Sequence, residues 1–171
     1  YKAAYKKGLS AISQGVTLNV ALDGNDFYAA TAGTTAGAVN EANTVANILN
    51  SRMNVVKNTV GSSDGMGYTL PTEGAVSADT NTALFFNDGV VFVFPKDVAA
   101  CTHGIAGQTD KICKGFIDVN GPKGPNKVVA CTGGAGDTCE VSTATDIYPV
   151  KFYDQTILPN SPAARAVLYG K

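Results

Sequence analysis

An apolar stripe at helical spacing opens the sequence and limits what this chain can fold into. Its members lie three or four residues apart: Tyr1, Tyr5, Leu9, Ile12, Val16 and Val20. Since an α-helix turns once every 3.6 residues, this spacing puts the stripe on one face and predicts an amphipathic helix over residues 1 to about 22. Gly8 and Gly15 each lower intrinsic helix stability by about 1 kcal/mol relative to Ala. The helix must therefore be held by packing against another part of the protein.

The start of this helix carries no capping signal. Tyr1 stands where Ser, Thr, Asp or Asn would satisfy the first backbone N–H groups. An uncapped start is what a cut through a longer helix leaves behind. We therefore expect that a signal or membrane segment preceded Tyr1 in the precursor.

A second helix and several strands are predicted downstream. Turn residues at 23–26 end the first helix, and apolar positions from Ala42 to Val56 recur at helical spacing, which predicts a helix over about 38–56. Residues 83–86 and 90–94 are rich in β-branched and aromatic side chains and flank a turn that ends in Gly89, so they predict a β-hairpin.

Two more strands are predicted after the hairpin. They cover residues 115–119 and 146–153, and Pro149 favours an edge position or a bulge for the second of them. The expected fold class is α+β, with a long N-terminal helix packed on an antiparallel sheet of about four strands. We expect a single domain over 1–171: the helix at 1–22, a variable region with the second helix at 23–82, and the sheet with cysteine-bearing loops at 83–171.

Charge and composition exclude some classes of function. The 13 basic and 14 acidic residues give a net charge of −1 and are spread along the chain. Without a run of Lys or Arg, binding to a nucleic-acid backbone is not expected. No apolar run approaches the roughly 18 residues that would span a bilayer.

Four cysteines lie within a short stretch of the second half: Cys101, Cys113, Cys131 and Cys139. An even number in a chain of this composition favours two disulfides and an oxidising compartment. The alternatives are buried thiols and a zinc site, although zinc ligands usually come in close C-x₂-C pairs, which are absent from the sequence. Three pairings are possible. Sequential pairing is preferred, since it closes short, glycine-containing loops.

His103 is the single histidine, so a Ser-His-Asp or Cys-His arrangement would have to include it. It lies on a loop between two cysteines, and an exposed surface histidine is the favoured interpretation. The G-x-S-x-G, P-loop and H-E-x-x-H motifs are all absent from the sequence. We therefore expect that the protein is not an enzyme and that it needs no cofactor.

Two short segments resemble a known superfamily. Residues 116–126 read F-I-D-V-N-G-P-K-G-P-N and resemble the D-x-N-G-x-x-x-P-N segment of many type IV pilins and pseudopilins. Residues 146–153 read D-I-Y-P-V-K-F-Y and resemble the last strand of that group, which has a D-[IV]-[FY]-P-V pattern. The opening at 4–12 is similar to the C-terminal half of a pilin spine helix. Residues 24–83 resemble no family.

The resemblance implies a structural role outside the cell. A precursor anchored in the cytoplasmic membrane by a preceding apolar helix would be cleaved and methylated by a prepilin peptidase. It would then join an extracellular filament on the bacterial surface. The partners would be other copies of the chain and the pilus or secretion assembly machinery. Tyr1, Tyr5 and Leu9 are the predicted subunit contacts; the alternative is that they are ordinary core residues.

A calcium site is a further expectation from the resemblance, because some pseudopilins hold calcium in a loop of the sheet. Asp118, Asn120 and Asp146 are the candidate ligands here. An EF-hand loop is excluded, because Pro122 and Lys123 stand where that loop needs a ligand and a glycine. The favoured alternative for Asp118 and Asn120 is an Asx-type turn that ends a strand.

Three functions are compatible with these patterns. The first is a structural subunit of a type IV pilus or pseudopilus. The second is a binding module, either a minor pilin or a surface adhesin whose loops between Cys101 and Cys139 touch a ligand. The third, supported by no catalytic motif, is a secreted enzyme of unrelated fold.

Overall fold

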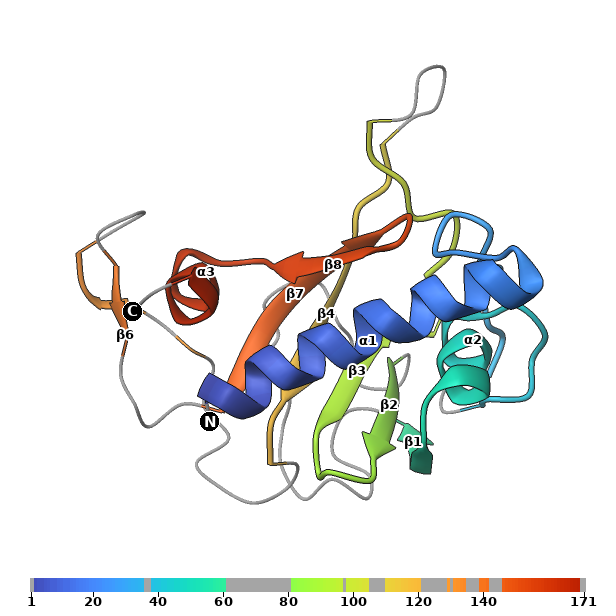
Figure 1. Ribbon diagram of the computed structural model, residues 1–171, viewed down its shortest axis with the longest axis horizontal. Helices are drawn as coiled ribbons and strands as arrows, with labels where there is room; N and C mark the ends of the chain where they lie inside the picture. The colour runs from blue at the N-terminus through green and yellow to red at the C-terminus, as the bar shows by residue number, and fades with distance from the viewer. Residues whose placement is uncertain are drawn as a thin grey trace.

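A long helix lies across one face of an antiparallel sheet in this computed structural model (Figure 1). The structure describes residues 2–35, 38–60, 81–96, 98–104, 110–120, 129, 131–134, 139–141 and 146–169. Helix α1 spans Lys2–Asp23. The six strands of the sheet are, in spatial order, β1 (Val55–Val60), β2 (Asn81–Phe86), β3 (Val91–Pro95), β4 (Cys113–Asp118), β7 (Ile147–Tyr153) and β8 (Thr156–Pro159).

The α+β class and the N-terminal helix are confirmed, whereas the expected number of strands was too low. The predicted hairpin is β2 and β3, joined by the turn at Gly89, which has a φ of 89°. The two other predicted strands are β4 and β7, and they are neighbours in the sheet. Within the six-stranded sheet, the strands that the sequence did not predict are β1 and β8, the first and last of the spatial order.

The apolar stripe of α1 faces the sheet, as its spacing predicts. Tyr5, Ile12 and Val16 are fully buried and Leu9 is 5% exposed. They belong to one core cluster with inward-facing side chains from β2, β3, β4 and β7. Burial of each such side chain stabilises the fold by about 1.5–3 kcal/mol, which offsets the weak helix propensity of the two glycines. Tyr1 lies outside the described residues.

The sheet buries both of its faces over β3. Phe92 and Phe94 belong to the core cluster under α1, while Val91 and Val93 belong to a second cluster. Successive side chains of a strand point to opposite faces, so the second cluster lies on the far side of the sheet. This explains why residues 90–94 form an unbroken apolar run.

Close packing between strands requires a glycine in β4. A Cβ atom at Gly115 would lie 2.5 Å from the carbonyl oxygen of Val93 on β3. Real side chains do not approach a carbonyl this closely, so any larger residue would push the two strands apart.

The second helix is shorter than predicted. Helix α2 spans Val45–Arg52, and the side chain of Thr44 caps it by accepting a hydrogen bond from the backbone N–H of Asn47 at 3.1 Å. Asn43 has a φ of 62°, so the chain cannot continue the helix backwards. Met53 is extended and ends the helix, and Val56 belongs to β1 with 60% exposure. The prediction of a helix over 38–56 was therefore wrong at both ends.

Pro149 occupies an inner strand, which corrects the expectation of an edge position or a bulge. It pairs with Phe116 of β4 in a continuous register. The backbone N–H of Asn160 donates to the Pro149 carbonyl at 2.9 Å, one residue beyond the end of β8. In an antiparallel strand the N–H and C=O of one residue face the same neighbouring strand, which for Pro149 is β8. The hydrogen bond that Pro149 cannot donate would therefore lie at the end of the β7–β8 ladder.

A third helix and a small second sheet complete the described structure. Helix α3 (Pro162–Tyr169) was not predicted; it begins where the Ser161 side chain accepts a hydrogen bond from the N–H of Ala164 at 3.0 Å. It buries Ala163, Ala164 and Val167, and it packs against α1 and the β7–β8 hairpin. Strands β5 (Cys131–Gly133) and β6 (Glu140–Val141) pair apart from the main sheet.

Within the part of the chain that the structure covers, every helix is too short or too polar to cross a bilayer.

Candidate functional site

The outward face of α1 is a long, weakly polar surface. Its exposed side chains are Ala3, Lys6, Lys7, Ser10, Gln14, Thr17, Leu18, Ala21, Leu22 and Asp23. Leu18 is 46% exposed and Leu22 is 62% exposed. Residues 8–22 carry no charged side chain. We call this face the outer face of α1. Over most of its length, another protein could pack on it without removing charged groups from water.

Two of the predicted subunit contacts do not lie on this face. Tyr5 is fully buried, where its ring stacks on that of Tyr148, and Leu9 is 5% exposed within the core cluster. A side chain buried inside its own domain has no surface left for a neighbouring copy. The expectation that Tyr5 and Leu9 contact another subunit is therefore corrected: both are core residues.

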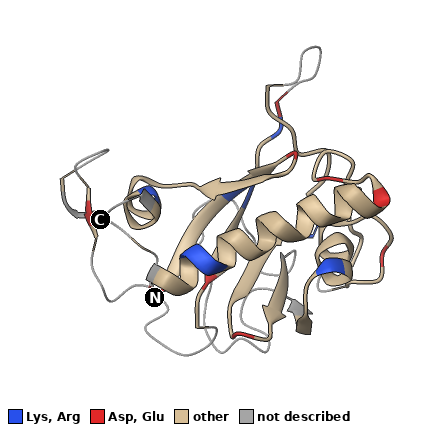
Figure 2. Cartoon of the chain, viewed as in Figure 1, with Lys and Arg blue, Asp and Glu red and all other residues tan. Residues whose placement is uncertain are grey.

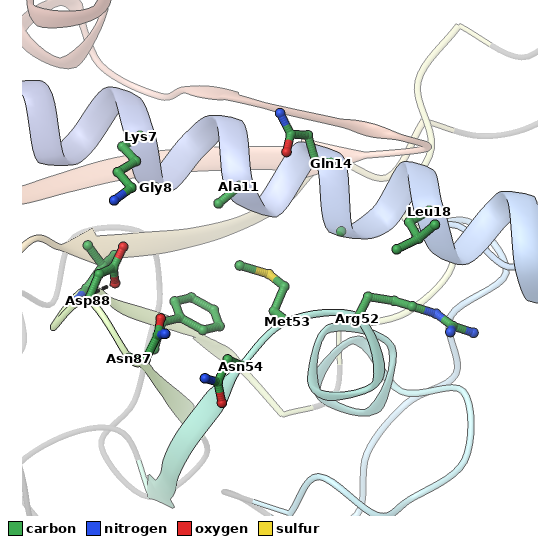
Figure 3. A pocket seen from close by; sticks show the side chains of 13 residues that line it. Lys7, Gly8, Ala11, Gln14, Leu18, Arg52, Met53, Asn54, Asn87 and Asp88 are labelled. Atoms are coloured by element: carbon green, nitrogen blue, oxygen red, sulfur yellow. Dashed lines mark hydrogen bonds between the residues drawn. The ribbon is translucent and has the colours of Figure 1, made fainter.

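A groove runs beside α1 on one side of this face (Figure 3). Its volume is about 480 Å³. One wall is α1, and the opposite wall is formed by the end of α2, by Met53 and Asn54 between α2 and β1, and by the β2–β3 turn (Figure 3). Its lining includes Lys7, Ala11, Leu18, Met53, Phe86 and Asp88.

Glycines on α1 bring the opposite wall close to the helix. A Cβ atom at Gly15 would lie 3.1 Å from Cγ of Met53, and one at Gly8 would lie 3.3 Å from Cγ1 of Val90. Both glycines line the groove. The presence of these two glycines on one side of the helix is the signal in the sequence that another part of the chain packs closely there. It does not show which residues form the other wall, because these come from α2 and the hairpin.

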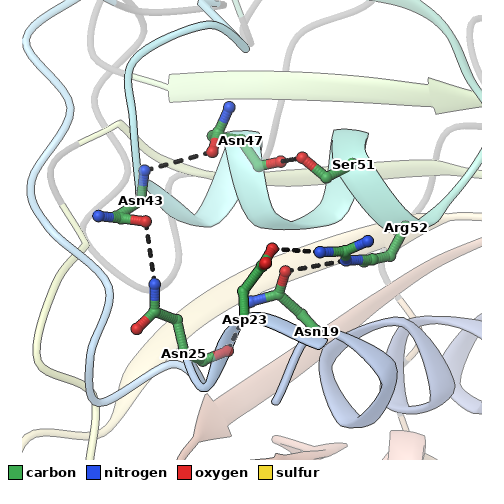
Figure 4. Close-up of polar contacts among 7 residues, drawn as sticks. All are labelled: Asn19, Asp23, Asn25, Asn43, Asn47, Ser51 and Arg52. Carbon is green, nitrogen blue, oxygen red and sulfur yellow. Dashed lines mark hydrogen bonds and ion pairs between the residues drawn. The ribbon is translucent and has the colours of Figure 1, made fainter. Parts of the chain in front are cut away.

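A polar network fixes the wall that α2 contributes (Figure 4). Nε of Arg52 donates to the side-chain oxygen of Asn19 at 3.0 Å, and the guanidinium forms an ion pair with Asp23. Nδ2 of Asn19 donates to the carbonyl oxygen of Asn25 at 2.6 Å, and Nδ2 of Asn25 donates to Oδ1 of Asn43 at 3.0 Å. These contacts bind the end of α1 to Arg52 at the end of α2 and to Asn43 just before its start.

Both sequential disulfides are present, Cys101–Cys113 and Cys131–Cys139. Cys101 and Cys113 are buried in the main core cluster, and Cys113 is the first residue of β4. Cys131 is exposed, and the second bond joins the two strands of the small sheet. The two bonds therefore differ in their access to solvent.

The loop that Cys101–Cys113 closes is restrained by a second set of contacts. Nδ1 of His103 lies 2.8 Å from Oδ2 of Asp110, and the N–H of Gly104 donates to Oδ1 of Asp110 at 3.1 Å. That hydrogen bond from Gly104, together with the His103 ring, lowers the pKa of Asp110 from its usual value. Tyr153 packs edge-on to His103, with ring centroids 5.2 Å apart. His103 is exposed, and these contacts hold its ring at the protein surface.

The three calcium candidates come together where β4 ends and β7 begins. Asp118 and Asp146 are fully buried, and the N–H of Val119 donates to the Asp146 carbonyl at 3.0 Å. The N–H of Asn120 donates to Oδ1 of Asp118 at 3.2 Å, which is the contact of the Asx-type turn. Among the residues that can be described, acidic, His and Cys side chains form no cluster of three or more suited to a metal ion. Calcium binding stays a prediction.

Comparison with known proteins adds no assignment: no protein-family model matches the sequence, and no curated protein or solved structure matches it.

Proposed function

We propose that this protein is a structural subunit of an extracellular filament, of the type IV pilus or pseudopilus kind. The observation that carries the proposal is the division of α1 into two faces. One face is buried on the protein's own sheet, while the outer face exposes Leu18 and Leu22 and carries no charged side chain between Lys7 and Asp23. A rigid helix presented in this way is suited to side-by-side packing with other copies.

The energetics support this use of the helix. Burial of apolar surface stabilises an assembly by about 25 cal/mol per Å², and no charge between Lys7 and Asp23 has to leave water. The core contacts of Tyr5 and Ile12 hold the helix on the sheet, so the outer face needs little ordering when copies associate.

The resemblance to pilins adds independent support. Its two segments begin in β4 and span β7, two adjacent strands of the sheet that α1 crosses. The proposed partners are other copies of the chain and a pilus or secretion assembly machinery. We propose no enzymatic activity and no nucleic-acid ligand. The proposed location is the bacterial surface, after release from a membrane-anchored precursor.

The proposal is tested on cells that make the protein. Surface filaments are sheared off and collected, and their subunits are identified by mass spectrometry. We expect this chain in the filament fraction and expect the filaments to disappear when its gene is deleted, with recovery on complementation. If the filament fraction never contains the chain, the proposal is wrong.

A binding module is the second candidate, and the loop closed by Cys101–Cys113 favours it. The two described arms of this loop, residues 101–104 and 110–113, lie at the top of Figure 1. The disulfide is at their base, and the pair of His103 with Asp110 lies further out, beyond the bridge between Thr102 and Lys111. Abundance separates the two candidates. A structural subunit makes up most of a sheared filament preparation, whereas a minor pilin or an adhesin is scarce.

A further inference from the structure

The two disulfides differ in what surrounds them. Cys101 and Cys113 are buried in the main core, whereas Cys131 is exposed and Cys139 is half-buried. Thiol–disulfide exchange requires a thiolate to reach one of the two sulfur atoms of the bond. The exposed position of Cys131 allows this approach in the folded protein, and the burial of Cys101 and Cys113 prevents it.

The small sheet that the exposed bond joins is too short to be stable alone. Strand β5 has three residues and β6 has two, and their pairing is irregular between Cys131 and Gly133. An isolated two-stranded ribbon is marginally stable in water even at greater length, because it buries little apolar surface. The bond between Cys131 and Cys139 is therefore a main restraint on this pairing.

Strand β6 lies against α3, and this contact is apolar. The half-buried Cys139 and Val141 pack on the core cluster that also includes the buried side of α3. Strand β6 and α3 each carry one charged residue, Glu140 and Arg165, and both are exposed (Figure 2). Apolar contacts are non-directional, so they do not fix β6 in one position unless its backbone is held. Loss of the disulfide should therefore release β6 from α3.

The contacts on either side of the small sheet confine this release to a short segment. The N–H of Val129, two residues before β5, donates to the Ile147 carbonyl at 2.8 Å, and Val129 is buried in the main core. Beyond β6, the carbonyl of the buried Asp146 accepts a hydrogen bond from the N–H of Val119 at 3.0 Å. These contacts attach the chain to β4 and β7 without the disulfide, so the main sheet should stay folded when the small sheet opens.

We propose that Cys131–Cys139 is a site of thiol–disulfide exchange with an external dithiol, and that its reduction opens the small sheet away from α3 without unfolding the domain. A thiolate of the dithiol attacks Sγ of Cys131, a mixed disulfide forms, and Cys139 leaves as a thiolate and is protonated. The second thiolate of the dithiol then attacks the dithiol sulfur of the mixed disulfide and releases Cys131, which is also protonated. The protein gains two electrons and two protons, and the dithiol becomes a disulfide.

Hydrogen exchange followed by mass spectrometry tests the opening in the purified protein. Dithiothreitol is added until one disulfide per chain is reduced, and exchange is compared before and after. We expect exchange to become faster by about tenfold or more in β5, β6 and α3, and to stay unchanged in α1, β4 and β7. Unchanged exchange in α3 overturns the proposal, and so does faster exchange throughout the main sheet.

The variant Cys131→Ser/Cys139→Ser is the matched control, because it removes the bond without a reductant. It should show the fast exchange of β6 and α3 from the start, and dithiothreitol at the same concentration should not increase it further. If this variant exchanges as slowly as the oxidised protein, the bond does not hold the small sheet. The reduced unaltered protein gives the same comparison where the variant does not fold.

Trapping of the mixed disulfide tests which sulfur is attacked. The probe is a Cys-x-x-Cys oxidoreductase whose second cysteine is replaced by serine, so that it cannot complete the reaction. We expect a covalent complex linked through Cys131, mapped by digestion and mass spectrometry. Reduction by dithiothreitol without a trapped complex supports exchange with small dithiols. A link through Cys139, Cys101 or Cys113 overturns the proposed attack. Because each readout uses the isolated protein, the outcome does not depend on the filament role.

Discussion

The ring of Tyr5 on α1 stacks on the ring of Tyr148 on β7, with centroids 4.1 Å apart and planes inclined by 9°. Both residues are buried. This pair joins the first turns of the helix to the strand that carries the pilin-like D-I-Y-P-V pattern. The helix is therefore fixed on the sheet near its start, in addition to the contacts of Ile12 and Val16 further along.

A double-mutant cycle should measure this stacking. We expect Tyr5→Leu and Tyr148→Leu each to lower the free energy of unfolding, with a coupling energy of about 0.5–1.5 kcal/mol between them. Chemical denaturation provides the measurement. The same cycle with Tyr5→Leu and Phe27→Leu is the control, since Phe27 follows the opposite end of α1 and packs on Phe152. Additive effects in the first cycle would show that the rings do not interact energetically.

Ile12→Asp should unfold the domain or lower its stability by more than about 4 kcal/mol, because it places a carboxylate in the fully buried helix–sheet core. Thermal melting followed by circular dichroism measures the effect. Ser10→Asp is the matched control on the exposed face of the same helix, and it should change stability by no more than about 0.5 kcal/mol. Equal melting of Ile12→Asp and the unaltered protein would mean that Ile12 does not face the sheet.

The two disulfides should be reduced in a fixed order. Cys131 is exposed, whereas Cys101 and Cys113 are buried, so mild reductant should first release the thiols of Cys131 and Cys139. Loss of the Cys101–Cys113 bond should then lower stability by about 2–4 kcal/mol. Thiol titration during reduction, with melting curves at each stage, gives the order. Release of the Cys101–Cys113 thiols first would contradict the burial argument.

Asp118→Ala should lower stability by about 1–3 kcal/mol, because it removes the acceptor for the N–H of Asn120 at the end of β4. Asp118→Asn keeps an acceptor oxygen and should have the smaller effect of the two. A calcium titration of the melting temperature checks the other hypothesis for this position. A rise in melting temperature with calcium that Asp118→Asn abolishes would favour a cation site over the Asx-type turn.

The contacts of Asp110 should weaken in acid. The hydrogen bond from Gly104 and the neighbouring His103 lower the pKa of Asp110 in the folded protein from 3.8. A lowered folded-state pKa means that this contribution to stability is present above the unfolded-state value and is lost as the pH falls through the folded-state value. NMR titration of the Asp110 carboxyl should show the low midpoint, and His103→Ala should move it upwards. An unchanged midpoint in His103→Ala would show that the ring has no influence on it.

Features with a local cause could be predicted from the sequence. The stripe from Tyr5 to Val16 repeats with the period of an α-helix, and its burial follows from that period. The hairpin around Gly89 combines a turn residue with two apolar runs, so each part supports the same structure. The number and spacing of the cysteines favour disulfides, and the preference for sequential pairing, which rests on short loops, is confirmed.

The boundaries of α2 and the position of β8 depended on the tertiary structure. Met53 and Val56 continue a helical pattern in the sequence, but pairing with β2 draws the chain into an extended strand at Val55. β8 is four residues long and gains its hydrogen bonds from β7. Short segments of this kind have weak preferences of their own, and contacts with distant residues decide their conformation.

The sequence by itself determined that α1 is a helix with one apolar side, because that property depends on neighbours three and four positions apart. The tertiary structure decided what covers that side, where Tyr5 stacks on Tyr148 of β7, and it left Leu18 and Leu22 exposed. It also formed the groove, whose second wall begins at Arg52 on another helix. A surface built from segments far apart in the chain leaves no local pattern in the sequence, because the contacts that stabilise it form only when the protein folds.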